Sequence, residues 1–282
     1  MKKKLLYPIT LILLTALSVL AQKEATPTPI QVPVQPEQLT MPFTLYIPIV
    51  RQADLGEVID IAPFMVGGNG RLYEVQHSSG SQARHQTQGD ESRFYHTKGN
   101  ELLAEWEELW ATDTHILRGT DTSPGNGQYY SLYDTPGSIG SEWAPRHWRV
   151  GEIFERNPLV IFYNKSNCQM VASGTQRSWL KFVDYYEQYT FESGIVLDEV
   201  IELAWLLDPD GTSIESYFYA KEYGLVGWGS NDRGLSYISE IHAPGQRPNN
   251  TRENIGCLSM TGWRMFADEI NYGPLPEPYR VK

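Results

Sequence analysis

The chain has 282 residues, of which 34 are acidic and 23 are basic, so its formal charge is −11 at pH 7. A protein with this acidic excess and no basic patch repels phosphate backbones and anionic lipid headgroups, which argues against a nucleic-acid partner and against binding to a membrane surface. The length is ample to bury one large hydrophobic core.

The first 21 residues predict a signal peptide. Three lysines follow Met1, an apolar run extends from Leu5 to Leu20, and Ala21 places a small side chain before the expected cleavage at Gln22. An uncleaved anchor is the alternative, but a run of roughly 16 residues is shorter than the roughly 20 that a membrane-spanning helix needs. We therefore expect a secreted protein, extracellular or associated with the cell surface, with no stable membrane span after cleavage. The mature chain would keep 20 basic and 34 acidic residues, a formal charge of −14.

Residues 22–42 predict a proline-rich linker. Its prolines are Pro27, Pro29, Pro33, Pro36 and Pro42. Proline fixes φ and donates no backbone hydrogen bond, so the segment favours extended polyproline II, in which twenty residues span roughly 60 Å. The alternative is a disordered terminus without a role. Residues 43–282 then form the β-rich extracellular domain, with 53–157 and 158–282 as its candidate sub-parts.

The N-terminal half of this domain gives mixed signals. Short strands are expected at Arg71–Val75, Ser92–Thr97 and Gln128–Tyr133. Over Asn100–Ala111, apolar residues recur at a spacing that places them on one face of a helix. These residues are Leu102, Leu103, Trp106, Leu109 and Trp110. We expect a short helix here, with a strand as the alternative at its C-terminal end.

The C-terminal half predicts an antiparallel meander of about five strands. The expected strands are Leu159–Tyr163, Trp179–Tyr186, Val196–Leu207, Ile214–Ala220, Gly224–Trp228 and Ser236–His242. In the third of them, alternation places Leu197, Ile201, Leu203 and Trp205 on one face, with Glu199 intruding. The segment Asp208–Gly211 is expected to turn, because Asp-Gly accommodates the positive φ of a tight hairpin.

The segment Glu215–Trp228 resembles the ExYYxAKGxGLV hairpin of uncharacterised secreted or lipid-anchored bacterial envelope proteins. The resemblance covers about 14 residues and implies a curved antiparallel sheet, with no particular chemistry. It departs at Glu222, where the pattern usually has glycine, which puts a tight turn there in doubt. The expected fold class is mainly β (β-rich α+β), an antiparallel meander, curved sheet or sandwich with at most one or two short helices.

Two cysteines, Cys168 and Cys257, are expected to form a disulfide in an oxidising extracellular space. Closing a loop of this length would stabilise the fold by up to ~4 kcal/mol. Two separate buried thiols are the alternative. The sequence has no CxxC motif and no histidine pair with ligand spacing, so neither a metal site nor a cofactor is predicted.

No catalytic residue is predicted, because the sequence has no GxSxG, HExxH, P-loop or GxGxxG motif. Carboxylates close to tryptophans leave one alternative, a secreted glycan hydrolase that uses two carboxyl groups about 5 to 9 Å apart. The candidate carboxylates are Glu105, Glu107, Glu108, Asp121, Glu142 and Glu152.

The aromatic content points instead to binding. The chain has 8 Trp and 17 Tyr, and flat rings with a polar tip can hold the faces of sugars. The candidate ligand-binding residues are Trp143, Trp148, Tyr129, Tyr130, Tyr133 and Arg146. Packing of a β core is the alternative use of these rings. We therefore expect a non-enzymatic surface or envelope module that binds a polymer such as a cell-surface or environmental polysaccharide, or else a purely structural envelope protein.

Overall fold

The computed structural model describes residues 56–77, 80–88, 91–98, 101–122, 127–230, 234–244, 251–253, 270–277 and 279. All of them belong to the second of two units, Tyr46–Lys282. The predicted signal peptide and linker lie outside the described residues, as does Cys257.

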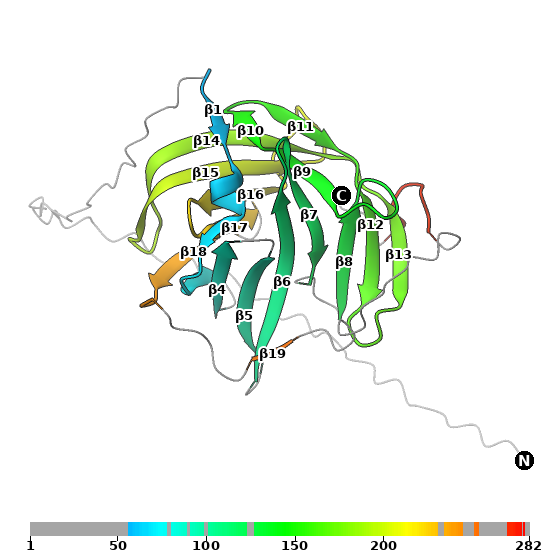
Figure 1. The fold of residues 1–282 in the computed structure, drawn as a ribbon, viewed down its shortest axis with the longest axis horizontal. Helices are drawn as coiled ribbons and strands as arrows, with labels where there is room; N and C mark the ends of the chain where they lie inside the picture. Colours follow the sequence, from blue (N-terminus) through cyan, green and yellow to red (C-terminus); the bar gives the residue numbers. More distant parts are fainter. Residues whose placement is uncertain are drawn as a thin grey trace, which may run out of the picture. The chain divides into compact units, whose positions relative to one another are not determined.

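The described unit is built almost wholly from β-strands (Figure 1). Its N-terminal elements are β1 (Val58–Asp60), α1 (Ala62–Met65), β2 (Gly67–Asn69), β3 (Tyr73–His77), β4 (Gly80–Gln88), β5 (Glu91–Lys98), β6 (Glu101–Ala111), β7 (His115–Asp121), β8 (Gln128–Tyr133) and β9 (Ser141–Pro145). The remaining elements are β10 (His147–Arg149), β11 (Ile153–Arg156), β12 (Leu159–Asn164), β13 (Met170–Thr175), β14 (Ser178–Thr190), β15 (Val196–Leu206), β16 (Glu215–Ala220), β17 (Gly224–Ser230), β18 (Gly234–Ile241) and β19 (Thr251–Glu253).

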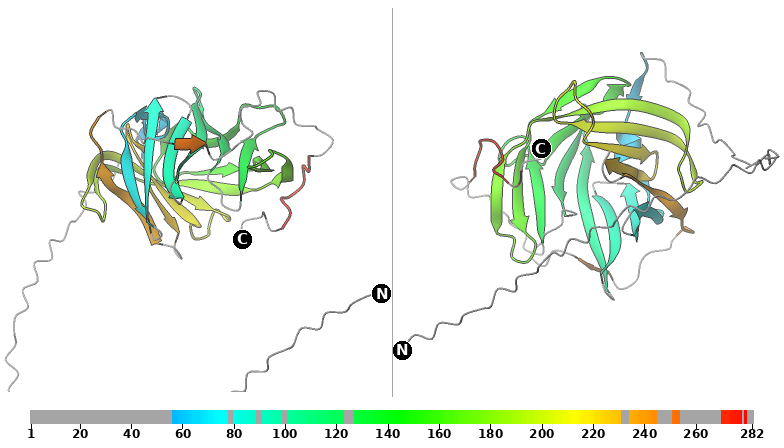
Figure 2. Two further views of the ribbon diagram at one scale, coloured as in Figure 1. Left: turned by 90° about the horizontal axis from the view of Figure 1, so that it is seen from below. Right: turned by 180° about the vertical axis from the view of Figure 1, so that it is seen from behind.

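Hydrogen bonding joins these strands into one large curved sheet and a separate β1–β10 pair. From β11 the pairing runs through β14, β15, β16, β17 and β18 to β3, and then through β4, β5 and β6 to β7. Strand β7 pairs with β9 along one half and β8 along the other, and β8 continues to β12 and β13. Every one of these pairings is antiparallel. Figure 2 shows the curvature from two further sides.

The predicted mainly β fold class is therefore confirmed, and β14 to β18 form the expected five-stranded antiparallel meander. The two candidate sub-parts share strand pairs, because β3 pairs with β18 and β8 pairs with β12. No described helix is long and apolar enough to cross a membrane.

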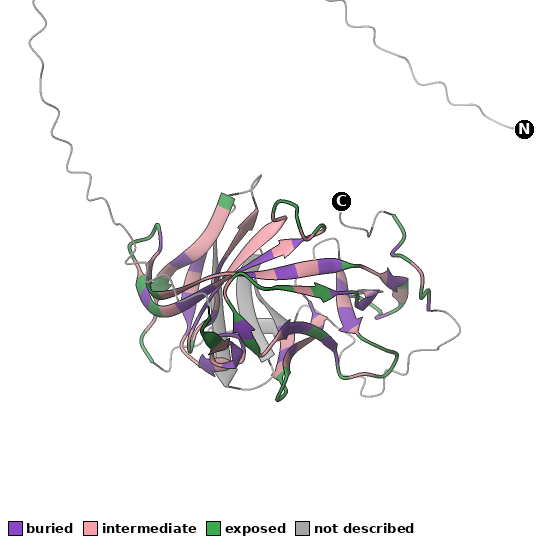
Figure 3. Cartoon of the chain, turned by 90° about the horizontal axis from the view of Figure 1, so that it is seen from above, coloured by how far each residue is buried: buried purple, intermediate pink, exposed green. Residues whose placement is uncertain are grey.

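The largest hydrophobic cluster of the described residues joins α1 to strands of the curved sheet. Figure 3 shows how buried and exposed residues are distributed along the strands. Its buried members are Ile61, Ala62, Phe64, Met65, Leu109, Ile116, Trp143, Ala144, Trp148, Leu180, Phe182, Ile201, Leu203 and Tyr219. Residues from both candidate sub-parts contribute to it. The short helix thus covers an apolar surface that strands from distant parts of the sequence create together.

The expected helix over Asn100–Ala111 is wrong, because this segment is the strand β6. Its backbone groups pair with β5 on one edge and with β7 on the other, and tertiary pairing of this kind overrides a local helical pattern. The register shifts between Glu107 and Leu109, where two steps along β6 match three along β7, so the extra residue of this bulge lies in β7. Glu107 and Leu109 point to the same buried side by ordinary strand alternation.

The expected single apolar face of β15 is also wrong in part. Ile201 and Leu203 join the cluster under α1, whereas Leu197 packs in a second cluster with Val200. The intruding Glu199 has φ 50°, so the alternation changes phase at this residue.

The loop between β15 and β16 turns at Asp208 as expected, with the amide of Gly211 donating to the Asp208 carbonyl oxygen at 3.0 Å. Gly211 is not among the residues with positive φ, so the predicted positive-φ geometry is wrong here. The wide loop accommodates an ordinary turn that leaves all φ angles negative.

Candidate functional site

The structure disperses the ligand-binding residues predicted from sequence. Trp143, Trp148 and Tyr129 are only 2–3% exposed, Tyr130 and Tyr133 are half-buried, and Arg146 lies beside α1. The ring of Trp148 packs on that of Phe182, and the ring of Tyr129 stacks on that of Tyr163 with centroids 5.0 Å apart. These rings therefore build the interior and do not form an exposed row for a sugar.

Trp143 is the centre of a buried charge cluster. The guanidinium carbons of Arg118 and Arg156 lie 4.4 and 3.8 Å from its ring centroid. Such contacts between cations and aromatic faces stabilise most when water is excluded. The cluster anchors Trp143 as a structural residue.

Arg118 neutralises two carboxylates that face one another. Glu107 on β6 and Asp121 on β7 are cross-strand partners, and both are almost fully buried. Arg118 forms ion pairs with both, and Tyr130 donates its hydroxyl proton to Asp121 Oδ2 at 2.8 Å. Burial acts to lower the pKa of Arg118, but the charge of Glu107, followed by Tyr130 and Asp121, raises it well above the ordinary value. Two of the carboxylates considered for hydrolysis, Glu107 and Asp121, are thus held in structural ion pairs with Arg118.

Arg156 is buried without a carboxylate in contact among the described residues. Its Nε donates to Ser178 Oγ at 3.3 Å, and its side chain is packed on Trp143. Burial, together with the nearby charge of Arg118, lowers the pKa of Arg156 to about 9. The aromatic ring and the hydroxyl replace part of the hydration that the guanidinium loses on burial.

A surface hollow of about 730 Å³ lies beside α1, within the size range of small-molecule sites. It is lined by Ala62, Pro63, Val66, Gly67, Gly68, Asn69, Trp110, Ala111, Arg146, Lys221 and Glu222. These residues come from α1, β2, the end of β6, the segment between β9 and β10, and the turn between β16 and β17. The wall combines apolar carbon, one tryptophan and side chains of both charges.

Backbone hydrogen bonds hold three of these segments together. The amide of Glu222 donates to the carbonyl oxygen of Pro63 at 3.3 Å, and the amide of Asn69 donates to the carbonyl oxygen of Glu222 at 2.7 Å. Gly67 approaches Pro63 so closely that a Cβ atom would lie 2.7 Å from the Pro63 carbonyl oxygen. Only glycine fits at this contact. The hollow is therefore bounded by rigid backbone on this side.

Arg146, which also lines the hollow, is fixed by three hydrogen bonds. Its Nε and Nη2 donate to the two carboxylate oxygens of Asp60 at 3.0 and 2.9 Å, and its Nη1 donates to the Thr112 carbonyl oxygen at 3.1 Å. A two-point contact of this kind fixes the plane of the guanidinium. Partial burial acts to raise the pKa of Asp60, but the bonds from Arg146 and the Ala62 amide outweigh it and lower that pKa.

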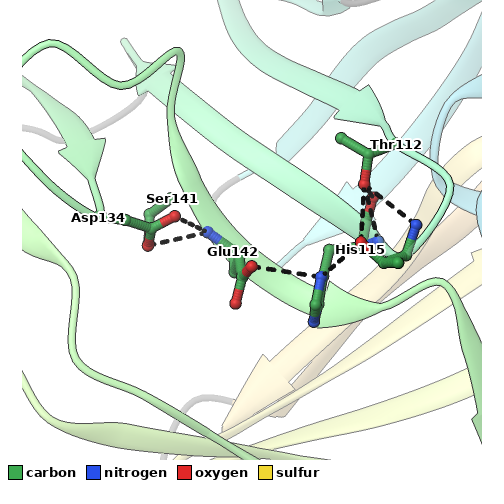
Figure 4. A network of polar contacts seen from close by, with 6 residues as sticks. Thr112, His115, Asp134, Ser141 and Glu142 are labelled. Carbon is green, nitrogen blue, oxygen red and sulfur yellow. Dashed lines mark hydrogen bonds and ion pairs between the residues drawn. The ribbon is translucent and has the colours of Figure 1, made fainter.

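A polar network fixes the turn that carries Thr112 (Figure 4). The Thr112 hydroxyl donates to the His115 carbonyl oxygen at 3.0 Å, and His115 Nδ1 lies 3.3 Å from Glu142 Oε1. The amide of Glu142 donates to Asp134, which also accepts the hydroxyl proton of Ser141. Glu142, a candidate carboxylate for hydrolysis, therefore belongs to this positioning network.

Trp110 is the aromatic residue of the hollow. It is half-buried at the end of β6, and its ring lies against Gly119 and Gly140, where added Cβ atoms would come within 2.6 and 3.0 Å of ring carbons. The two glycines leave room for the ring, which a larger residue would displace. The indole is thus held in one position at the wall.

The turn between β16 and β17 supplies the two charged residues of the near wall. Lys221 Nζ donates to both oxygens of Glu199 at 2.9 and 2.8 Å. No described residue bonds the side chain of Glu222, which is exposed. Both Glu199 and Glu222 have positive φ, at 50° and 68°. Such φ values in residues other than glycine store strain and concentrate at functional sites.

The tight turn that the sequence put in doubt does form, with Glu222 at a positive φ of 68°. Because glycine adopts this φ without strain, Glu222→Gly should stabilise the fold. Relief of the left-handed strain gains about 1–2 kcal/mol, and the added freedom of the unfolded chain offsets about 0.5–1 kcal/mol of it. We expect a net gain of about 0.5–1 kcal/mol in the free energy of unfolding, measured by urea titration. Gly224→Ala is the matched control, since Gly224 has φ 82° and the change should destabilise. A loss of stability in Glu222→Gly would contradict this account of the turn.

Two further carboxylates, Asp184 and Glu202, are direct partners across β14 and β15. Tyr186 donates its hydroxyl proton to Glu202 Oε2 at 2.8 Å. Burial raises the pKa of Glu202, and the charge of Asp184 adds to this, although the bond from Tyr186 acts in the opposite direction. Neither carboxylate lines the hollow beside α1.

Because the folded-state pKa of Glu202 is raised, the folded chain holds this proton more tightly than the unfolded chain does. The contribution of Glu202 to stability is therefore greatest at acidic pH and is lost as the pH rises through its folded-state pKa. We expect Glu202→Gln to match the wild type in melting temperature near the pKa of a free glutamate and to exceed it at neutral pH. Asp198→Asn, an exposed change on the same strand, should leave the pH dependence of the melting temperature unchanged. Parallel curves for wild type and Glu202→Gln would argue against the raised pKa.

Sequence reasoning named Arg146 but missed most of the hollow. Trp110 was assigned to a helix, and Glu222 was treated only as a departure from a turn pattern. Glu222 is the residue by which the sequence could have indicated the hollow. A charged residue at a turn position that favours glycine suggests a role beyond shaping the turn. Cys168 is buried, while its predicted partner Cys257 lies outside the described residues, so the disulfide stays a prediction.

In comparisons with known proteins, no protein-family model, no curated protein and no solved structure matches the chain.

Proposed function

We propose that this chain is an exported, non-catalytic module that binds a glycan in the hollow beside α1. The observation that carries the proposal is the wall of that hollow, which combines Trp110 with hydrogen-bond donors and acceptors. Sugar recognition uses this combination, because the ring supports the apolar face of the sugar while donors and acceptors bond its hydroxyls.

The charges of the wall fit a hydroxyl-rich ligand better than a strongly anionic one. Arg146 and Lys221 are already paired with Asp60 and Glu199. Their remaining hydrogen-bonding capacity can be shared with hydroxyl groups without desolvating an isolated charge. Export from the cell rests on the signal-peptide pattern and the proline-rich linker.

Trp110→Ala should weaken binding strongly with little loss of stability, since the ring is half-buried at the surface of the sheet. Losing a stacking platform typically costs about 2 kcal/mol or more of binding free energy, roughly 30-fold in affinity. The measurement is a glycan array with the mature protein, followed by calorimetric titration of the glycans that it retains. Trp179→Ala is the matched control, because Trp179 is also half-buried but lies outside the hollow. Equal affinities for the two variants would defeat the proposal.

A secreted glycan hydrolase is the second candidate, and the facing pair Asp184 and Glu202 is the observation that favours it. One carboxyl of such a pair must hold its proton at the working pH, and a raised pKa of Glu202 acts in that direction. Release of reducing ends from a polysaccharide by the wild type, lost in Glu202→Gln, would favour hydrolysis. Binding without release favours the module proposed above.

A further inference from the structure

We infer that the glycan held in the hollow beside α1 carries a free amine, and that Glu222 selects it. The inference rests on the proposed function and adds the class of ligand. Its starting point is the charge pattern of the residues that line the hollow, where each cation has its own carboxylate but Glu222 has no described cation.

Among the described residues of this wall, Glu222 is the charged side chain that has no ion-pair partner. Arg146 is held by both oxygens of Asp60, and Lys221 by both oxygens of Glu199, so neither cation is available to neutralise Glu222. A ligand that meets the wall therefore encounters an exposed carboxylate. The acidic chain as a whole, with a formal charge of −11, adds a field that attracts cations and repels anions.

The position of Glu222 is fixed on both sides by backbone. Its amide bonds Pro63 and its carbonyl oxygen bonds Asn69, while its φ of 68° is one that glycine would adopt without strain. A carboxylate is thus presented from a rigid turn, at a cost in stability that a purely structural turn would not require. Recognition of a ligand amine explains why a glutamate stands there.

The ligand group that fits is a primary ammonium. It donates three hydrogen bonds and carries one positive charge, and a carboxylate accepts from it strongly. An N-acetylated sugar of the same shape offers a single neutral donor. Hydroxyls and ring faces of either sugar would still meet the remaining wall, so the acetylated form should bind more weakly but measurably.

The test compares glucosamine oligomers with N-acetylglucosamine oligomers of equal length, titrated calorimetrically into the mature protein at about pH 6, where an amine with a pKa near that of an α-amino group is protonated. We expect the wild type to bind the amine-bearing oligomer about three- to fivefold more tightly, and we expect added salt to reduce this ratio. Glu222→Gln should bring the ratio close to one and keep the affinity for the acetylated oligomer. Glu222→Lys should favour the acetylated oligomer.

Glu192→Gln is the matched control, since Glu192 is also exposed but does not line the hollow, and it should leave the ratio unchanged. Equal binding of the two oligomers by the wild type, or a ratio that survives Glu222→Gln, overturns the role of Glu222 while the glycan-binding function stands. Binding of neither oligomer overturns the inference, and the proposed function fails with it only if the glycan array is also blank.

Discussion

Arg118→Met should destabilise the folded chain by ~3–5 kcal/mol, the largest effect expected of any charge removal among the described residues. The substitution leaves Glu107 and Asp121 facing one another across β6 and β7 without the guanidinium that lies between them. Like charges directly opposite in a sheet repel, and burial prevents water from screening them. The cation contact with Trp143 is lost as well.

The triple variant Arg118→Met, Glu107→Gln, Asp121→Asn separates charge from packing. It removes the cation and both carboxylates while nearly preserving volume, and a buried ion cluster replaced as a whole is often close to neutral in stability. We expect the triple variant to recover most of the free energy of unfolding lost in Arg118→Met, measured by urea titration at neutral pH. If Arg118→Met alone costs less than about 1 kcal/mol, the ion pairs do not hold this part of the sheet together.

Trp148→Ala should cost about 3–5 kcal/mol of folding free energy, because it removes a large, fully buried side chain. Trp148 lies in the core under α1, where its ring packs on Phe182 at a centroid distance of 5.6 Å. Strand β14, which carries Phe182, is paired with β11 on one edge and with β15 on the other, and this pairing resists movement of β14 into the space left behind. Thermal and urea unfolding should both show the loss.

Trp148→Phe is the control for this substitution, since it keeps an apolar ring in the core and should retain more of the stability. Binding measured on Trp148→Ala would report unfolding and not ligand contact, and the same holds for Trp143, which is enclosed by two arginines. A Trp148→Ala variant as stable as the wild type would show that the core under α1 is not needed for folding.

The strands of the C-terminal half were predictable from sequence because each carries a local signal. Alternating apolar residues in β14 to β16 and the turn at Asp208 are decided within a few residues of chain. The helix expected over Asn100–Ala111 is wrong because the backbone of β6 pairs with β5 and β7, and this pairing is not visible in the local pattern of apolar residues. The expected single apolar face of β15 is wrong for a related reason. The strand changes face at Glu199, whose positive φ accompanies a hydrogen bond from the Lys221 amide to the Glu199 carbonyl oxygen.

Little of the candidate site could be predicted. The tryptophans that the sequence singled out, Trp143 and Trp148, are buried in the core, while Trp110 lines the hollow. A tryptophan ring has the same chemical character in the core and at a surface. Composition alone therefore cannot tell a ring that packs in the core from one that contacts a ligand. Arg146 lines the hollow, but its place beside α1 depends on Asp60, 86 residues away.

The sequence by itself determined the class of fold, the antiparallel meander and the acidic character of the chain, because alternation, turn residues and net charge are properties of neighbouring residues or of simple sums. Only the tertiary structure decided which rings are buried, which carboxylates face one another and where the hollow lies. Those features depend on strands such as β3 and β18 that are distant in the chain and meet only in the folded sheet. Glu222 is visible in the sequence as a departure from a turn pattern, but only the structure shows that no residue in the described part of the chain forms an ion pair with it.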